Sequence, residues 1–256
     1  MPKFTRFLVI SASALLLTLQ GCASHSSYPS GSSGGASTPV PPPMAEQDNG
    51  GTDGSTAPLL PSLLFPGEGK AFTGWRCTPD QGLVTANDGD TLRLWSAHGA
   101  WSLDPAVVAS GERYQQGDLS FWAKGPDATV ESSRGRLSCE RNIQQDALTR
   151  AQFPGVMFRA QGNEPSWVLT LANDVPEIFL SLDYGEREIT LPYRVIAMDN
   201  AEGRVELASG QSARPFDVRI EAGACFDSMS GQPWPARVEL TVNDQTYRGC
   251  GQGIAP

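Results

Sequence analysis

The stretch Arg237-Val-Glu-Leu-Thr-Val242 alternates charged or polar residues with apolar ones, which is the pattern of a β-strand with one buried face. The same period of two returns in three other short runs, namely Thr91-Leu-Arg-Leu-Trp95, Leu119-Ser-Phe-Trp-Ala123 and Arg204-Val-Glu-Leu207. Gly, Asp, Asn and Pro separate these runs at intervals typical of turns. The sequence therefore predicts an all-β chain of antiparallel sandwiches or closed barrels.

The amino terminus predicts export from the cytoplasm. Lys3 and Arg6 precede an apolar run, residues 7–19. This run is shorter than the roughly 20 residues that a membrane-spanning helix needs, so residues 1–21 are expected to be a signal peptide. The run ends in Leu19-Gln-Gly-Cys22, which resembles the bacterial lipobox. That resemblance implies cleavage before Cys22 and fatty acylation, such as palmitate, of its thiol and amine; an ordinary signal peptide with a chance Cys is the alternative.

Two or more acyl chains make a stable membrane anchor, whereas one chain binds only marginally. Ala23 follows the lipidated Cys, in place of the Asp that commonly retains such lipoproteins at the inner membrane. We therefore expect the protein to be anchored in the bacterial outer membrane and to face the periplasm.

Residues 22–69 are rich in Ser, Gly and Pro and show neither helical nor strand periodicity. Such a composition buries too little apolar surface to offset the entropy of ordering, so a disordered tether is expected. The patch Leu59-Leu-Pro-Ser-Leu-Leu-Phe65 is too apolar for a pure linker. It lies either on the first domain or on lipid, and the sequence leaves both possibilities open.

The remaining residues are expected to form two small antiparallel β domains rather than one domain of medium size. The predicted organisation is a first domain over residues 70–141, a connecting segment over 142–152 and a second domain over 153–256 that is either a barrel or a sandwich. The apolar spacing within residues 142–150 fits one short connecting helix.

After Cys22, four cysteines remain, and none of them forms a C-x-x-C pair. The chain has two histidines, so a zinc site lacks plausible ligands and we expect no metal or other cofactor. In an oxidising periplasm the four should form disulfides. Three connectivities are possible, and two compact domains favour Cys77 with Cys139 and Cys225 with Cys250.

The net charge of −9 is unevenly distributed along the chain. Residues 70–145 hold eight Lys or Arg against nine Asp or Glu, whereas residues 150–256 hold nine against fourteen. Because no basic stripe is present, binding to nucleic acid is not expected. The net negative charge has two explanations: it steers a basic protein partner toward the complex, or it is the ordinary charge of a soluble periplasmic protein. Nothing in the sequence indicates the oligomeric state.

Four short motifs occur in a fixed order between residues 72 and 141. They are Trp75-Arg-Cys77, Ser110-Gly-Glu-Arg-Tyr114, Trp122-Ala-Lys-Gly-Pro-Asp-Ala128 and the closing Cys139. The ordered set resembles the membrane-bound inhibitors of C-type lysozyme, over about seventy of the 256 residues. The resemblance implies a small β-barrel for the first domain and a C-type lysozyme as its protein partner.

The resemblance also implies the binding residues. Lysozyme's cleft holds two carboxyl groups, one a general acid with a raised pKa and one ionised. The family assigns Ser110 and Lys124 to this cleft, where an ammonium neutralises the ionised carboxylate and a hydroxyl both donates and accepts hydrogen bonds. Tyr114 belongs to the same site, but both it and Trp122 are expected to be core or wall residues and not direct contacts. Glu112 lies beside Ser110, where an extra acid weakens contact with carboxylates.

The second domain resembles a domain of uncharacterised bacterial lipoproteins through Gly162-Asn-Glu-Pro-Ser-Trp167 and Cys225-Phe-Asp-Ser-Met-Ser-Gly231. Asp227 and its neighbouring serines suggest either chemistry or, preferably, a hydrogen-bonded turn. A nucleophile elbow and a usable His are missing, so we infer no enzyme. The main hypothesis is a lysozyme inhibitor; the alternatives are an envelope interaction or structural lipoprotein that binds a protein or glycan, and, less favoured, an enzyme that uses the second domain's acids.

Overall fold

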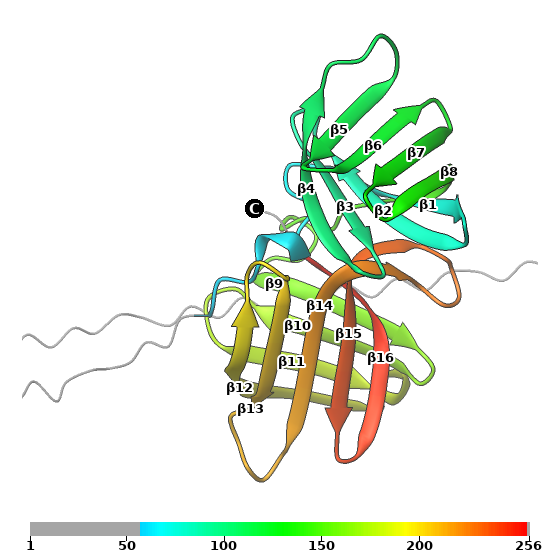
Figure 1. Ribbon diagram of the computed structural model, residues 1–256. Coiled ribbons are helices and arrows are strands. Elements are labelled where there is room, and N and C mark those ends of the chain that lie inside the picture. Colours follow the sequence, from blue (N-terminus) through cyan, green and yellow to red (C-terminus); the bar gives the residue numbers. More distant parts are fainter. Residues whose placement is uncertain (1–56, 255–256) are drawn as a thin grey trace, which may run out of the picture. The chain divides into compact units, whose positions relative to one another are not determined.

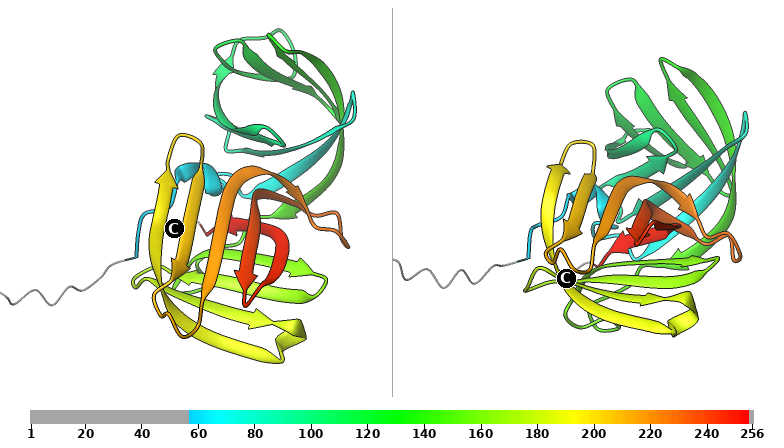
Figure 2. Two further views of the ribbon diagram at one scale, coloured as in Figure 1. Left: turned by 60° about the horizontal axis from the view of Figure 1, so that its bottom comes forward. Right: turned by 90° about the horizontal axis from the view of Figure 1, so that it is seen from below.

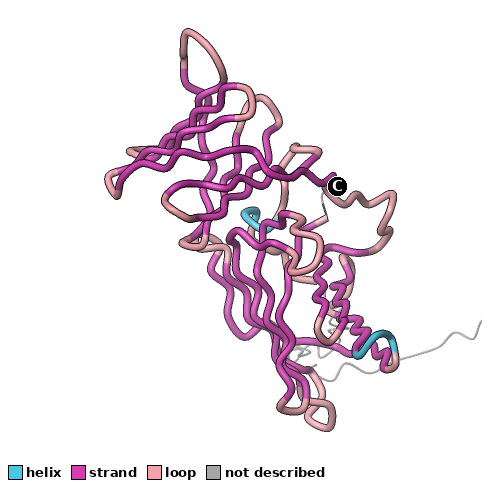
Figure 3. Tube along the Cα trace, turned by 90° about the vertical axis from the view of Figure 1, so that its right-hand side faces the viewer, coloured by secondary structure: helices cyan, strands magenta, loops and turns pink. Residues whose placement is uncertain are grey.

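The computed structural model describes residues 57–254. The predicted signal peptide, Cys22 and the tether up to residue 56 lie outside these residues. The described chain falls within one compact unit, Thr52–Pro256. Strands and their connecting loops make up nearly all of it, with two single turns of 3₁₀-helix, η1 (Ser62–Leu64) and η2 (Asp183–Gly185) (Figure 3). The predicted all-β class is confirmed.

The first eight strands form a closed antiparallel barrel in simple sequence order (Figure 1). They are β1 (Ala71–Thr78), β2 (Gln81–Asn87), β3 (Leu92–Ser96), β4 (Gly99–Ala106), β5 (Glu112–Gln116), β6 (Leu119–Lys124), β7 (Asp127–Ser132) and β8 (Gly135–Asp146). Pairing of β1 with β8 closes the barrel, with Cys77 opposite Cys139. Closure leaves no unpaired strand edge that another chain can extend.

The next eight strands form a second closed barrel (Figure 2). They are β9 (Val156–Asn163), β10 (Ser166–Ala172), β11 (Glu177–Leu182), β12 (Arg187–Asp199), β13 (Arg204–Ser209), β14 (Phe216–Phe226), β15 (Pro233–Val242) and β16 (Gln245–Gly253). Here β16 pairs with β9, and Cys250 lies opposite Gln161. Of the two architectures that the pattern allowed for this domain, the structure has the barrel.

The alternating runs have the burial that their period predicts. In β15, for example, Val238, Leu240 and Val242 point into the barrel and are buried, whereas Glu239 is only partly covered. The core of the first barrel is built on aromatic and aliphatic side chains, including Trp75, Leu83, Leu92, Leu94, Leu103, Tyr114 and Phe121. Burying one such large side chain contributes about 1.5–3 kcal/mol to the free energy of unfolding.

The apolar patch Leu59 to Phe65 packs against the protein itself. Leu60 and Leu64 are buried and belong to the same apolar cluster as the interior of the second barrel. Trp95, on β3 of the first barrel, donates its indole N–H to the Leu63 carbonyl at 2.7 Å. The buried part of the patch therefore contacts both barrels and not the first domain alone, whereas Leu59 is 90% exposed, and the described fold begins before residue 70.

Residues 142–146 continue strand β8 and do not form the short helix that their apolar spacing predicted. Their backbone pairs with the first residues of β1, where Ala71 lies opposite Asp146. The interaction that decides their conformation is therefore a pairing with residues about seventy positions away, which a local pattern does not contain.

Candidate functional site

Strands β5 and β6, which are neighbours in the first barrel, bring Ser110 and Lys124 to the same end of their ladder. Glu112, the first residue of β5, lies opposite Ala123 near the end of β6. Ser110 precedes Glu112 by two residues and Lys124 follows Ala123 directly, so both stand where this ladder ends. Both residues are exposed.

Trp122 of β6 contacts the Ser110-Gly111 pair that precedes β5. Trp122 donates its indole N–H to the carbonyl oxygen of Ser110 at 3.0 Å. Gly111 has a positive φ of 74°, and a Cβ at this position would lie 2.3 Å from the carbonyl oxygen of Ala123. A side chain is therefore excluded by both conformation and space. Glycine at position 111 therefore allows the Ser110 backbone to lie against β6.

Tyr114 is buried in the core of the first barrel, with 4% of its surface exposed, whereas Trp122 is 40% exposed and is not a core residue. Its hydroxyl donates to Asn87 Oδ1 at 3.1 Å, and the Asn87 amide lies 2.8 Å from the same hydroxyl. The Asn87 amide also donates to Glu112 Oε2 at 3.1 Å. The acid beside Ser110 is thus held by Asn87, a residue that the sequence did not indicate because it lies 25 positions away.

Lys124 is the last residue of β6, and its backbone lies opposite that of Asp127, the first residue of β7. Its ammonium forms no ion pair within the described residues. Arg141 supports this turn from β8: its backbone N–H donates to the Pro126 carbonyl at 2.8 Å and its guanidinium to the Gly125 carbonyl at 3.3 Å. The backbone beside Lys124 is therefore fixed, while none of the described carboxylates holds its ammonium.

The same end of the barrel carries carboxylates. Burial raises the pKa of the Tyr114 hydroxyl, a hydrogen bond from Asn87 lowers it, and the nearby charges of Glu112, Asp88 and Asp90 raise it further. The net shift is upward, so the hydroxyl stays protonated near neutral pH. Three carboxylates, Glu112, Asp88 and Asp90, therefore lie close enough to the Tyr114 hydroxyl to affect its pKa.

Residues 75–137 match the family model of the membrane-bound lysozyme-inhibitor of c-type lysozyme. The matched segment runs from β1 into β8 and contains Ser110, Gly111, Tyr114, Trp122 and Lys124. A search of curated proteins finds no match to the chain. The resemblance seen in the motifs is thus confirmed for the β1–β8 barrel, which we call the lysozyme-inhibitor-like barrel, while the β9–β16 barrel lies outside the match.

One disulfide lies in each barrel. Cys77 and Cys139 join the two strands that close the lysozyme-inhibitor-like barrel, and Cys225 and Cys250 join β14 to β16. These are the pairs that two compact domains favoured. By loop-closure entropy they stabilise the fold by roughly 4 and 3.5 kcal/mol at most, for separations of 62 and 25 residues.

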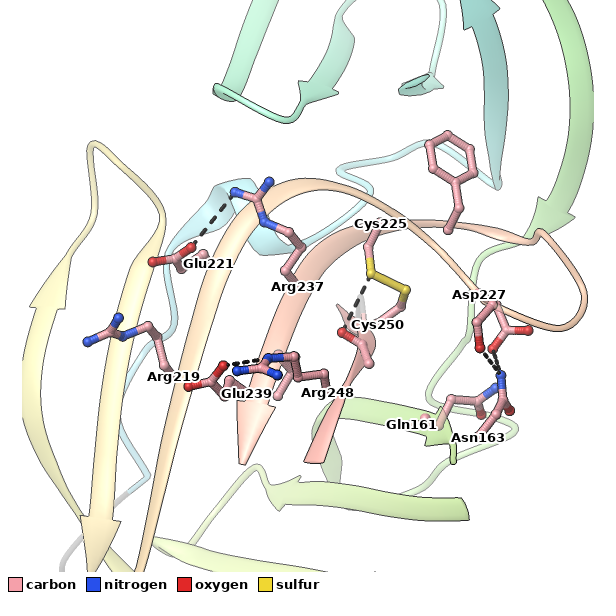
Figure 4. Close-up of a pocket in the computed structure, with 15 residues that line it drawn as sticks. Gln161, Asn163, Arg219, Glu221, Cys225, Asp227, Arg237, Glu239, Arg248 and Cys250 are labelled. Carbon is pink, nitrogen blue, oxygen red and sulfur yellow. Dashed lines mark hydrogen bonds and ion pairs between the residues drawn. A yellow bond between two sulfur atoms is a disulfide. The ribbon is translucent and has the colours of Figure 1, made fainter. Parts of the chain in front are cut away.

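The β9–β16 barrel has a groove of about 440 Å³ on its outer side (Figure 4). Each of its arginines forms an ion pair. Within the lining, Arg237 pairs with Glu221 at 3.8 Å and Arg248 with Glu239 at 2.8 Å. Arg219 pairs with Glu206, which lies outside the lining, at 3.1 Å. Figure 4 places the Cys225–Cys250 disulfide between these charges and Asp227. Because exposed ion pairs of this kind contribute only about 0–1 kcal/mol each, the lining is an ordinary cross-strand charge ladder.

Asp227 shapes a turn. Its Oδ1 accepts hydrogen bonds from the backbone N–H groups of Ser230 and Met229, at 2.7 and 3.2 Å, while Oδ2 accepts from the Asn163 amide at 2.8 Å. Burial raises the pKa of the Asp227 carboxyl, but these hydrogen bonds outweigh it and the pKa lies below its ordinary value. The bonding is that of a side chain that caps a turn, which was the preferred interpretation of this motif.

Two further properties concern residues 57–254. This part of the chain has no group of three or more His, Cys, Asp or Glu residues placed to hold a metal ion. It also has no helix whose length and apolar content suffice to cross a membrane.

Proposed function

We propose that this chain inhibits C-type lysozyme by inserting Ser110 and Lys124 into the enzyme's carboxylate-lined cleft. The family match over residues 75–137 supports a lysozyme-inhibitor role in general, with the enzyme as a protein partner. The proposal for the two side chains rests on one observation, which is that the β5–β6 ladder ends with both of them together.

The chemistry of the cleft fits these two groups. An ionised carboxylate attracts an ammonium, and Lys124 has no carboxylate partner within the described residues that would compete. A protonated carboxyl and a carboxylate both form hydrogen bonds with a hydroxyl, which donates and accepts. Because Trp122 and Gly111 hold the Ser110 backbone, little conformational entropy is lost when its hydroxyl docks.

Tyr114 takes part by supporting the loop and not by entering the cleft. Its buried ring and its hydrogen bonds with Asn87 hold β2 and β5 together, and Asn87 in turn holds the Glu112 carboxylate. Binding of lysozyme breaks and makes no covalent bond, so the proposed role is that of an inhibitor and not of an enzyme.

We further propose that the protein is anchored by lipid at Cys22 in the outer membrane and faces the periplasm. The description of the matched family as membrane-bound suggests membrane association. The lipobox-like Leu19 to Cys22 and the following Ala23 support the finer assignment.

The test is titration of a C-type lysozyme with the wild type, Lys124→Ala and Ser110→Ala, by binding calorimetry and residual cell-wall lysis. Removing one member of a desolvated charge pair commonly costs 2 to 5 kcal/mol, roughly a thirtyfold to several-thousandfold loss of affinity. Ser110→Ala should cost about 1 kcal/mol, which is roughly fivefold, because a neutral hydrogen bond is lost.

Lys70→Ala is the matched control, because Lys70 is the other lysine of the described chain, is likewise exposed and lies outside the proposed site. It should inhibit like the wild type. Full inhibition by Lys124→Ala, or an equal loss in Lys70→Ala, would show that the ammonium of Lys124 does not bind the cleft.

A further inference from the structure

A second groove, of about 570 Å³, lies outside the segment matched to the inhibitor family. The end of β8, the segment that follows it, and strands β9 and β15 supply its walls. The lining is mostly polar and consists of Gln144, Gln145, Asp146, Leu148, Phe153, Arg159, Gln161, Gln232 and Trp234. We call it the glutamine groove, because four of these nine residues are glutamines.

Arg159 of β9 is the cation of this groove, and no carboxylate in the described chain pairs with it. It is partly buried, and its guanidinium stacks over the Phe153 ring at 5.3 Å. The guanidinium of Arg159 makes one hydrogen bond within the described chain, a long one from Nη1 to Gln161 Oε1 at 3.4 Å. Burial lowers its pKa, and no carboxylate in the described part of the chain offsets that effect.

This situation differs from that of the other partly covered arginines on the same barrel. Arg187 and Arg237, for example, each lie within ion-pair distance of a carboxylate, at 2.6 and 3.8 Å. A guanidinium has five N–H donors in a planar fork that matches a carboxylate. Partial burial of such a charge without a partner is unfavourable, so Arg159 provides an anion-binding group in the groove.

The glutamines provide groups that bind hydroxyls. An amide side chain both donates and accepts, so it can bind a hydroxyl or an acetamido group in either direction. Gln145 is already engaged, because its amide donates to the Pro233 carbonyl at 2.8 Å. The side chains of Gln144 and Gln232, by contrast, make no hydrogen bond within the described chain and remain available. Asp146, at the rim, adds an acceptor.

We propose that the glutamine groove binds an acidic saccharide, with Arg159 pairing to the carboxylate of the sugar and Gln144 and Gln232 binding its hydroxyl or acetamido groups. Leu148 and Phe153 supply apolar surface for the carbon skeleton. The site is separate from Ser110 and Lys124, so it does not depend on lysozyme inhibition.

The experiment is calorimetric titration of the full chain with two matched pairs of sugars, glucuronate against glucose and N-acetylmuramate against N-acetylglucosamine. Within each pair the sugars differ by a carboxylate-bearing group. In at least one pair the acidic sugar should bind about tenfold or more tightly than the neutral one, because a charge-assisted hydrogen bond is gained. Acetate, tested alone, should bind much more weakly.

Arg159→Gln should abolish the preference for the acidic sugar, and Gln144→Ala should weaken binding of that sugar severalfold. Arg150→Gln is the matched control, because Arg150 is exposed and lies outside the groove, and it should change neither value. Equal binding of acidic and neutral sugars in both pairs, or acetate binding as tightly as the sugar acid, would overturn the proposal. If Arg159→Gln does not fold, Gln144→Ala provides the test, because Gln144 is exposed and its replacement should leave the fold intact. Unchanged binding of the acidic sugar by Gln144→Ala would then overturn the proposal.

Discussion

Gly111→Ala should separate the role of the Ser110 loop from the stability of the barrel. Gly111 has a φ of 74°, a conformation that costs a residue with a Cβ about 1–2 kcal/mol. The new Cβ would also lie 2.3 Å from the Ala123 carbonyl oxygen and 3.2 Å from Trp122 Nε1. Crowding of this kind costs about 1–3 kcal/mol, so the free energy of unfolding should fall by about 2–5 kcal/mol.

Gly117→Ala is the matched control. Gly117 lies in the neighbouring β5–β6 turn with a φ of 58°, but no atom lies within 4 Å of the Cβ that would be added. It should therefore cost only the conformational part, about 1–2 kcal/mol. A domain of this kind is stable by about 5–15 kcal/mol, so Gly117→Ala should remain folded, and urea denaturation of Gly111→Ala gives the folded fraction by which its titration is corrected.

The two variants should differ most in function. To relieve the contact with Ala123, the backbone of Gly111 must move away from β6, which lengthens the hydrogen bond from Trp122 to Ser110. Urea denaturation and lysozyme titration of the same samples measure both effects. We expect inhibition by Gly111→Ala to be at least about fivefold weaker, the loss of one neutral hydrogen bond, and inhibition by Gly117→Ala to be unchanged. Equal stability and equal inhibition in the two variants would refute the assigned role of Gly111.

Three further predictions concern the anchor, the disulfides and the Asp227 turn. Cys22→Ser should move the protein from the membrane fraction to the soluble fraction; a processed variant that still fractionates with membranes contradicts lipidation at Cys22. Peptide mapping without reduction should recover Cys77 with Cys139 and Cys225 with Cys250, and a bridge between the two barrels contradicts this pairing. Asp227→Ala should lower the free energy of unfolding by about 1–3 kcal/mol near neutral pH, because hydrogen bonds from Ser230 and Asn163 are lost. Folding lowers the pKa of Asp227, so its carboxylate stabilises the fold fully above the unfolded-state pKa of about 4 and loses this effect as the pH falls. The difference in unfolding free energy between wild type and Asp227→Ala should therefore shrink on acidification. A difference that grows contradicts the assignment.

The strand pattern was readable from the sequence because the side-chain period of a half-buried strand is local. Val238, Leu240 and Val242 alternate with Arg237 and Glu239 in a run of six residues, and burial follows that alternation. The same local period could not distinguish a barrel from a sandwich in the second domain. That choice depends on whether β16 pairs with β9, and these strands lie about ninety residues apart.

A local pattern gave a wrong prediction where a distant partner decided the conformation. Ile143, Ala147 and Leu148 have helical spacing, yet β1 draws residues 142–146 into β8. The apolar patch near Leu64 was recognised as unusual for a linker, but its position depends on Trp95 and on the interior of the second barrel. Propensity and spacing are weak compared with the burial and pairing that tertiary contacts supply.

The sequence by itself determined the all-β class, the favoured disulfide pairs and the order of the inhibitor-like motifs, because each depends on residue types and spacing along the chain. Only the tertiary structure decided that Asn87 holds Tyr114 and Glu112, that Arg141 supports the turn beside Lys124, and that no carboxylate among residues 57–254 pairs with Arg159. Each of these depends on which atoms meet across strands, and the physical reason is that hydrogen bonds and ion pairs act over a few ångströms in space, whatever the separation in sequence.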